Sequence, residues 1–191
     1  DSAIFANMGA SIAVKKLGTS SITKEEIYKI SNKENKTKIV PYENILEIIN
    51  ELKINKKTIG FTNGCFDLIH SGHIDMLKKA AESCDKLIVA VNSDQSIKRL
   101  KGESRPILNL EAREKLLSSL EMIDFVISFK EDTPINLIKI IKPNILFKGA
   151  DYKTKDIIGA NYIKKNGGKV IRIKLTKNQS TTKLISMLEK N

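Results

Sequence analysis

Two histidines, His70 and His73, are the only imidazoles in the chain and stand three residues apart. They lie between a predicted strand over residues 57–62 and a predicted helix over residues 72–83, so both rings meet at a helix entrance. Gly72 lets a ligand approach the backbone there, and free amides at the positive end of a helix favour a phosphate. The pattern indicates a phosphate site, with a structural histidine pair and a metal site as open alternatives.

The residue types give the metal alternative little support. Zinc sites combine several histidines and cysteines at short spacing, and this chain has only Cys65 and Cys84 besides its two histidines. We therefore expect no metal ligands in the protein. Cys65 has no base beside it, so we expect it to pack rather than to act as a nucleophile. Two cysteines form no disulfide framework, which favours a reducing cytoplasm as the compartment.

Basic residues exceed acidic ones by 33 to 22, giving a formal net charge of +11. Because 29 of the 33 are lysines, a solvated lysine-rich surface explains the excess better than a nucleic-acid patch. Aromatic residues make up only 5% of the chain, which offers few platforms for stacking single strands. Three of the four arginines, Arg99, Arg105 and Arg113, stand close together, and their planar groups suit phosphate. No apolar run approaches the roughly 20 residues of a membrane span.

The elements that position these residues alternate between apolar β-branched runs and amphipathic segments. Strands are predicted over 57–62, 86–91, 125–129, 144–147 and 170–173; helices over 41–52, 72–83, from Ser93/Asp94 onward, 109–120, 134–141, 155–165 and 181–189. Asn109 is the predicted N-cap of its helix. Five buried strands separated by helices predict an α/β domain with a Rossmann-like, doubly wound, five-stranded parallel sheet. Ligands of such sheets bind beyond the carboxyl ends of the strands.

The first 35 residues do not continue this rhythm. Helices are predicted over 4–17 and 23–30, followed by a polar linker over 31–38. We place a boundary near residue 36, with a small helical region at 1–35 and the α/β domain at 36–191. The first residue is Asp1 rather than Met, and an apolar helix at 4–17 needs a larger partner to cover it. We expect the chain to be part of a longer protein.

Five segments, GCFDLIHSGHI, VNSDQSIKRLKGESRP, FKEDTP, FKGADY and QSTTKLI, together resemble the adenylyltransferase domains of ADP-heptose synthases. These belong to the nucleotidyltransferase superfamily with the HxGH signature, and the resemblance covers about residues 38–191. The segment ANMGASIAVKKLGTSSIT, within residues 3–27, is similar to the end of a ribokinase-like sugar kinase domain. The resemblance implies a fused kinase domain upstream, of which only a remnant is present, and hence no kinase reaction by this chain.

The resemblance implies transfer of AMP from ATP, with Mg²⁺, to D-glycero-β-D-manno-heptose 1-phosphate, for lipopolysaccharide or capsule precursors. It assigns transition-state contacts to His70, His73 and Lys101. It assigns nucleotide contacts to Asn63, Gly64, Cys65, Phe66, Gly72, Lys148, Gly149, Asp151, Ser180, Thr181 and Thr182. It assigns contacts with the sugar phosphate to Asp67, Arg99 and Arg113. The nucleophile is already ionised, so the reaction needs positioning and charge stabilisation rather than a general base.

Several of these residues have an alternative role in the fold. Asp67 is equally suited to hydrogen-bonding its own turn, Arg113 to an ion pair with a nearby Glu, and Ser180 to capping the last helix. Asp151 has a loop turn as its alternative. The superfamily often carries an Arg shortly before the STT segment, and this chain has Lys174 and Lys177 there instead.

Two other functions fit the same motifs. A cytidylyltransferase acting on another sugar or polyol phosphate shares the fold, because backbone contacts choose the base. A nucleotide-binding or RNA-binding module without catalysis is the third possibility, and the intact His70, His73 and Ser180 argue against it. We expect small-molecule substrates, no membrane partner and a possible homodimer.

Overall fold

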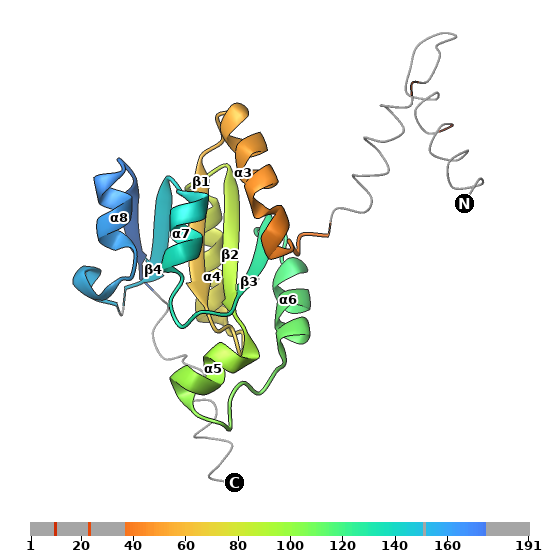
Figure 1. Ribbon diagram of the computed structural model, residues 1–191, viewed down its shortest axis with the longest axis vertical. Helices are drawn as coiled ribbons and strands as arrows, with labels where there is room; N and C mark the ends of the chain where they lie inside the picture. Colours follow the sequence, from red (N-terminus) through yellow and green to blue (C-terminus); the bar gives the residue numbers. More distant parts are fainter. Residues whose placement is uncertain (1–9, 11–22, 24–36, 151, 175–191) are drawn as a thin grey trace. The chain divides into compact units, whose positions relative to one another are not determined.

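The computed structural model describes residues 37–150 and 152–174, together with Ala10 and Thr23 (Figure 1). The chain divides into two compact units, Asp1–Thr37 and Lys38–Asn191. The helices predicted over 4–17, 23–30 and 181–189 lie outside the described residues, as do Asp151, Ser180, Thr181 and Thr182. The fold described below belongs to the second unit.

Strands and helices alternate along this unit. In chain order they are η1 (Tyr42–Asn44), α3 (Ile45–Ile54), β1 (Ile59–Gly64), α4 (Ser71–Ala81), β2 (Lys86–Asn92), α5 (Asp94–Lys101), α6 (Leu110–Ser118), β3 (Phe125–Phe129), α7 (Ile135–Ile141), β4 (Ile145–Gly149), η2 (Thr154–Asp156), α8 (Ala160–Lys165) and β5 (Lys169–Ile173). The five predicted strands are confirmed, and each runs within two residues of its predicted bounds.

The strands form one sheet in the order β3-β2-β1-β4-β5, and every pairing is parallel. The chain adds strands outward from β1 to β3 and then returns to the other side of β1 with β4. The strand order therefore reverses between β1 and β4, and the crevice beyond their carboxyl ends is the expected ligand site of such a sheet. The predicted doubly wound, Rossmann-like α/β class is confirmed.

Two apolar layers hold the helices against the sheet. One core joins α3, α7 and α8 to strand residues such as Phe61, Ala90 and Leu146. The other joins α4 and α6 to residues of the opposite face, such as Val89 and Phe147. Figure 1 shows α3, α7 and α8 in front of the sheet and α4 behind it. The helix α5 lies beyond the carboxyl ends of the strands, where it contributes to the site.

Local side-chain contacts set where two of the helices begin. The Ser93 hydroxyl accepts a hydrogen bond from the Ser96 amide at 3.2 Å, and α5 then ends at Gly102 with φ +96°. The predicted N-cap of α6 is confirmed, because Asn109 Oδ1 accepts from the Ala112 amide at 2.9 Å. Each cap satisfies an amide that the helix itself leaves unpaired.

Two details differ from the sequence prediction. The helix predicted over 155–165 is split into η2 and α8, because Gly159 adopts a left-handed conformation with φ +86° that a continuous helix excludes. Leu46, one of the apolar residues of the helix predicted over 41–52, is 55% exposed, whereas Ile45, Ile49 and Leu52 are buried. The apolar face of α3 is therefore narrower than its sequence predicts.

The start of the unit is attached to the edge of the sheet. Ile39 forms a parallel bridge with Val126 of β3, the Val126 amide donates to the Lys38 carbonyl, and the Val40 amide donates to the Val126 carbonyl. Among the described residues, none of the helices combines the length and apolar character that crossing a membrane requires.

Candidate active site

An open cavity of about 530 Å³ lies at the carboxyl ends of the strands. Its size is in the range of sites that hold a small ligand or cofactor. The lining comes from β1 and the loop after it, the ends of β2 and β4, α4, α5, the loop after β3, and the segment before α8. The residues that line it are Thr62, Asn63, Gly64, Cys65, Phe66, Asp67, His70, His73, Met76, Asn92, Leu100, Lys101, Asp132, Pro134, Lys148, Gly149, Tyr152, Asp156, Ile157 and Ile158.

A strained turn after β1 brings the two histidines to this cavity. Phe66 has φ +47°, a left-handed conformation that is unusual for an aromatic residue. Its ring is 4% exposed and packs over Gly64, where an added Cβ would lie 3.2 Å from Phe66 Cε2. The same ring contacts His73 with centroids 5.4 Å apart. The Phe66 side chain therefore forms the support against which His73 is positioned.

The His70 and His73 rings stack on one another, with centroids 3.8 Å apart and an interplanar angle of 26°. Burial, together with smaller effects of the nearby His70 and Lys101, lowers the pKa of His73 to about 4. Burial also lowers the pKa of His70. Burial strips water from the charged imidazolium form, which is the main reason for both directions, and for His73 the neighbouring His70 and Lys101 add a smaller effect of the same sign. His73 is therefore neutral at pH 7 and presents one N–H donor and one lone pair.

Several buried polar atoms around the histidines have no hydrogen-bond partner among the described residues. They are Thr62 Oγ1, Asn63 Oδ1 and the Nδ1 atoms of His70 and His73. Buried polar groups normally find a partner, and leaving one unpaired costs about 1–3 kcal/mol. All four residues line the cavity, so a polar ligand or water held there can supply the missing partners.

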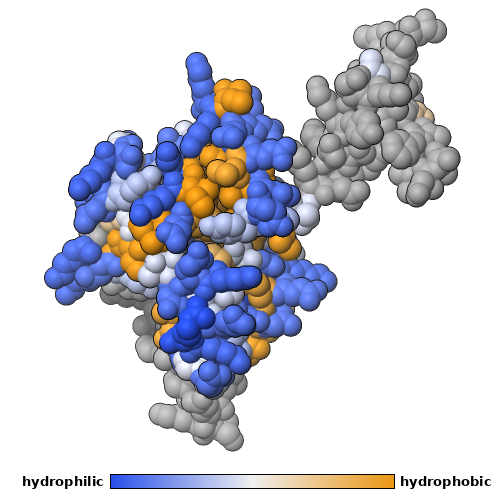
Figure 2. Space-filling view, viewed as in Figure 1, coloured by the Kyte–Doolittle hydropathy of each residue, from blue (hydrophilic) through white to orange (hydrophobic). Residues whose placement is uncertain are grey.

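Two lysines contribute positive charge to the cavity. Lys101 is the last residue of α5, and in the described part of the chain it has no ion-pair or hydrogen-bond partner. Figure 2 shows hydrophilic side chains gathered over α5 on the viewed face. Lys148 on β4 donates to the Asn63 carbonyl at 2.8 Å, and its Nζ lies 5.4 Å from the centre of the Tyr152 ring. Lys101 reaches the cavity from α5 and Lys148 from β4, and together they favour an anionic ligand.

Arg113 holds the site together and does not face the cavity, contrary to the contact with the sugar phosphate that we predicted. Its side chain is fully buried. The guanidinium donates to the Cys65 carbonyl at 2.7 Å, to the Leu108 carbonyl at 3.0 Å and to Asp94 Oδ1 at 2.7 Å. It therefore joins the β1–α4 loop, the first turn of α5 and the loop before α6. The predicted ion-pair alternative is present, with Asp94 rather than Glu as the partner.

Asp67 lines the cavity, but its carboxylate is occupied by the protein. Arg105 pairs with it, and the amides of Ile107 and Leu108 donate to Asp67 Oδ1 at 2.7 and 3.0 Å. With 2% of the residue exposed, the carboxylate fixes the loop between α5 and α6. Among the described residues, these partners of Asp67 lie in the loop between α5 and α6, so neither the predicted substrate contact nor the predicted bond to its own turn describes it.

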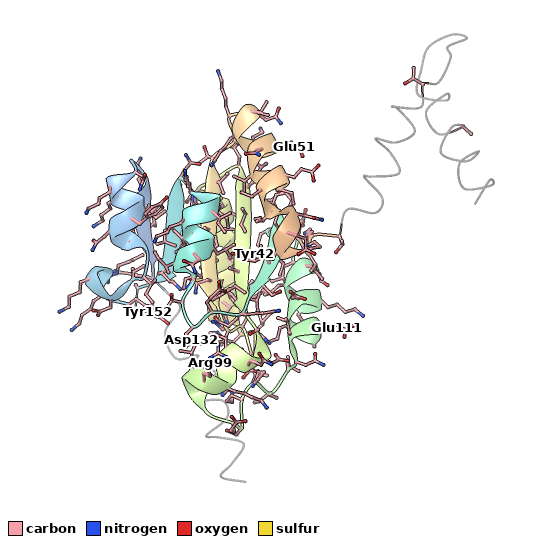
Figure 3. The ribbon with its side chains drawn as sticks, viewed as in Figure 1. Tyr42, Glu51, Arg99, Glu111, Asp132 and Tyr152 are labelled. Atoms are coloured by element: carbon pink, nitrogen blue, oxygen red, sulfur yellow. The ribbon has the colours of Figure 1, made fainter. Side chains whose placement is uncertain are left out.

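Arg99 also differs from its predicted contact with the sugar phosphate. It is exposed and does not line the cavity. Its Nε lies 2.7 Å from Asp132 Oδ1, and its Nη2 donates to the Lys130 carbonyl at 2.7 Å. The partner, Asp132, is the residue that reaches the cavity wall. Figure 3 shows Arg99 and Asp132 next to each other where α5 meets the loop after β3.

The structure brings most of the predicted residues to one cavity and adds others that sequence reasoning missed. His70, His73, Lys101, Lys148, Gly149 and the segment Asn63–Gly64–Cys65–Phe66 all line it, while Gly72 is buried in the first turn of α4. The missed residues at the cavity include Thr62, Asn92, Asp132 and Tyr152, and Asp94 was missed as the partner of Arg113. The positions of Asn92 and Tyr152 at strand ends were a usable signal. Thr62 and Asp132 had none, because strand threonines and loop aspartates are common.

The described residues include no group of three or more histidines, cysteines or acidic residues that could hold a metal ion. The carboxylates that line the cavity are Asp67, Asp132 and Asp156. Two of them are already paired with arginines. A divalent ion at this site would therefore take most of its ligands from phosphate oxygens and water, as Mg²⁺ commonly does.

Comparison with known proteins gives the class of this domain. Residues 61–187 match the family described as cytidylyltransferase-like. Together with the parallel sheet and the histidine pair at the end of β1, this match defines a nucleotidyltransferase. The chain belongs to the cytidylyltransferase-like family.

The most informative relatives share one name. The chain is 40% identical over 184 residues to the bifunctional protein HldE of Gluconobacter oxydans, covering 95% of this chain and 38% of that protein. It is 45% identical over 192 residues to HldE of Nitratiruptor sp., covering 98% of this chain and 41% of that protein. The chain thus spans about two fifths of the length of these relatives.

Solved structures show the same fold. A lipopolysaccharide core biosynthesis protein from Thermoplasma volcanium superposes with a TM-score of 0.52 at 29% identity, covering 64% of this chain and 99% of that one. A pantoate-beta-alanine ligase from Francisella tularensis superposes with a TM-score of 0.55 at 23% identity, covering 74% of this chain and 67% of that one.

Because Arg113 is buried and Arg99 is exposed, we expect their substitution to change the free energy of unfolding by different amounts, although both arginines pair with an aspartate. Arg113 and Arg99 each have Nη2 2.7 Å from an aspartate oxygen, but Arg113 is fully buried and the Arg99 side chain is 49% exposed. Arg113→Met leaves two carbonyl oxygens without a donor and should lower the free energy of unfolding by about 3 kcal/mol. Arg99→Met should cost less than about 1 kcal/mol. Urea unfolding of both variants measures this, and equal losses would contradict it.

The lowered pKa of His73 predicts a pH dependence of stability. The unfolded chain binds a proton near pH 6.5, whereas the folded chain resists it until about pH 4. As the pH falls through this window the unfolded state gains protons, so stability decreases, by about 3 kcal/mol in full. Urea midpoints of wild type and His73→Gln, measured between pH 7 and pH 4.5, isolate the contribution of His73 to the pH dependence of stability. The carboxylates titrate in both proteins, so their contribution cancels in the comparison. Parallel profiles would count against a neutral His73.

Proposed function

We propose that this domain transfers AMP from ATP to D-glycero-β-D-manno-heptose 1-phosphate. A phosphate oxygen of the sugar forms a bond to the α-phosphorus of ATP, and the bond from that phosphorus to the bridging oxygen breaks. The products are ADP-heptose and pyrophosphate, and the former serves as a precursor for lipopolysaccharide or capsule.

One observation carries the proposal that the domain is catalytic. Two stacked, partly buried histidines meet at the entrance of α4, with Lys101 beside them and unpaired polar atoms around them. This arrangement concentrates preorganised donors on one small volume. The sugar substrate is supported by the similarity to proteins named HldE and to the lipopolysaccharide core biosynthesis protein from Thermoplasma volcanium.

The chain's own residues then have distinct tasks. The sugar phosphate is already ionised, so no side chain needs to remove a proton. As charge builds up on the oxygens around the α-phosphorus, His70 and His73 donate N–H bonds to them. Lys101 and Lys148 offset the charge on the triphosphate and the leaving pyrophosphate. Asn63, Gly64 and Phe66 shape the floor on which the nucleotide lies, with Gly72 allowing the phosphates close to the first turn of α4.

Mg²⁺ enters this scheme with ATP. It would neutralise part of the triphosphate charge and remain bound mainly to phosphate oxygens and water.

The longer context is also part of the proposal. The relatives are called bifunctional and are more than twice as long as this chain. The resemblance of residues 3–27 to the end of a sugar kinase supports an upstream kinase domain as the partner in the complete protein.

A second candidate function rests on the family description. The matching family is cytidylyltransferase-like, so CTP with another sugar or polyol phosphate is the alternative pair of substrates. Pyrophosphate release measured with ATP, CTP, GTP and UTP, each with the heptose phosphate as acceptor, separates the two. We expect ATP to give the fastest turnover. A tenfold advantage of CTP would replace the adenylyl assignment.

The histidine pair makes a second prediction about turnover. Loss of one preorganised donor costs on the order of 10²- to 10³-fold in kcat. His70→Gln and His73→Gln should each show such a loss while the melting temperature changes little, because glutamine keeps much of the volume. The losses need not add, since both rings address one phosphate group. Normal kcat in a folded variant would remove that histidine from the catalytic residues.

A further inference from the structure

Asp132 has one carboxylate oxygen held by the protein and one left open. Both the Nε and the Nη2 of Arg99 lie 2.7 Å from Asp132 Oδ1. Among the described residues, Oδ2 has no hydrogen-bond partner. Asp132 lines the cavity whereas Arg99 does not, so the arginine holds the carboxylate from outside. The Asp132 side chain is 51% exposed, and its partner-free oxygen at the cavity wall is a hydrogen-bond acceptor for a ligand.

The loop that carries Asp132 is anchored by a buried hydrogen-bond chain. Asn92, at the end of β2, donates to Ser96 Oγ at 3.0 Å, and Ser96 Oγ donates to the Glu131 carbonyl at 2.9 Å. Arg99 adds its bond to the Lys130 carbonyl. The backbone on the N-terminal side of Asp132 is therefore tied to β2 and α5. This preorganisation lowers the cost of ordering the carboxylate when a ligand binds.

The charge of Asp132 restricts what that ligand group can be. A carboxylate repels phosphate, and the cations that attract phosphate at this cavity, Lys101 and Lys148, come from other elements. A carboxylate accepts hydrogen bonds from hydroxyl groups, which are the other polar groups of a sugar phosphate and a nucleotide. The free oxygen of Asp132 thus suits a hydroxyl.

The strand order decides which of the two substrates supplies that hydroxyl. The order reverses between β1 and β4, so the nucleotide belongs in the crevice beyond those two strands, with Lys148, Gly149 and Tyr152. Asp132 follows β3, which is two strands away from β1 on the opposite side from β4. The side near β2 and β3 is left for the acceptor.

We propose that Asp132 binds a hydroxyl of the acceptor sugar phosphate and thereby selects polyhydroxylated acceptors, and that Arg99 positions it. This inference rests on the proposed function, because it assigns the acceptor end of that same cavity. It makes Asp132 a specificity-determining residue, whereas Arg99 acts only through Asp132.

The test measures the KM for the acceptor and for ATP separately, with pyrophosphate release as the signal and heptose 1-phosphate as acceptor. Loss of a hydrogen bond to a charged group should raise the acceptor KM of Asp132→Ala on the order of 10- to 100-fold. The KM for ATP should stay within about twofold. Glu131→Gln is the matched control, since it removes a neighbouring carboxylate that does not line the cavity. It should leave both KM values unchanged.

A set of acceptors that each lack one hydroxyl identifies the contact. With one of these deoxy sugar phosphates, the kcat/KM of wild type should fall by a factor similar to the effect of Asp132→Ala. The kcat/KM of Asp132→Ala should be nearly the same with that deoxy acceptor as with heptose 1-phosphate. Arg99→Lys should raise the acceptor KM less than Asp132→Ala does. In the Asp132→Ala background, Arg99→Lys should cause no further rise in the acceptor KM. If Arg99 had a merely structural role, its substitution would change the acceptor KM in that background as well.

Three results would overturn the assignment of Asp132 while leaving the proposed function intact: an unchanged acceptor KM, a raised KM for ATP alone, or a raised Mg²⁺ requirement alone. If wild type does not use heptose 1-phosphate, the proposed function fails. The same KM comparison is then made with hexose and glycerol phosphates, where an effect of Asp132→Ala on acceptor KM still supports the inference. If the protein uses no sugar or polyol phosphate as acceptor, both the proposed function and the assignment of Asp132 are wrong.

Discussion

The cavity depends on the buried guanidinium of Arg113. Three segments that are separate in the sequence meet at it: the loop after β1 through the Cys65 carbonyl, the start of α5 through Asp94, and the loop before α6 through the Leu108 carbonyl. A fully buried charge is tolerated only where it is paired and hydrogen-bonded, so these partners are obligatory for the fold. The histidine turn and the cationic end of α5 are therefore fixed relative to each other before any ligand arrives.

Neutral, positive and negative side chains occupy different parts of the cavity. The chain carries a large positive excess, yet burial lowers the pKa of both histidines at the centre of the site. Lysines supply the positive charge from other elements, and carboxylates lie toward both ends of the sheet. Such a division matches a ligand pair whose phosphates meet in the middle and whose hydroxylated parts point outward.

Much of the fold was predictable because apolar β-branched runs alternate with amphipathic segments at the spacing of a parallel sheet. Both histidines of the motif line the cavity at the carboxyl ends of the strands. What the sequence could not provide was the pairing of its arginines. Arg99, Arg105 and Arg113 look alike as a cluster, but each binds an aspartate from a different segment, respectively Asp132, Asp67 and Asp94. Which of them is exposed and which is fully buried depends on tertiary packing, and no local spacing encodes it.

The attachment of residues 38–40 to β3 also has a consequence for self-association. An unpaired strand edge is a template for adding a strand from another molecule. On one side of the sheet, the chain's own backbone occupies the hydrogen-bonding groups of Val126. On the other side, β5 is the last strand of the described sheet and carries the exposed Lys169 and Arg172. One edge is thus partly covered and the other is charged, which disfavours growth of the sheet into intermolecular aggregates.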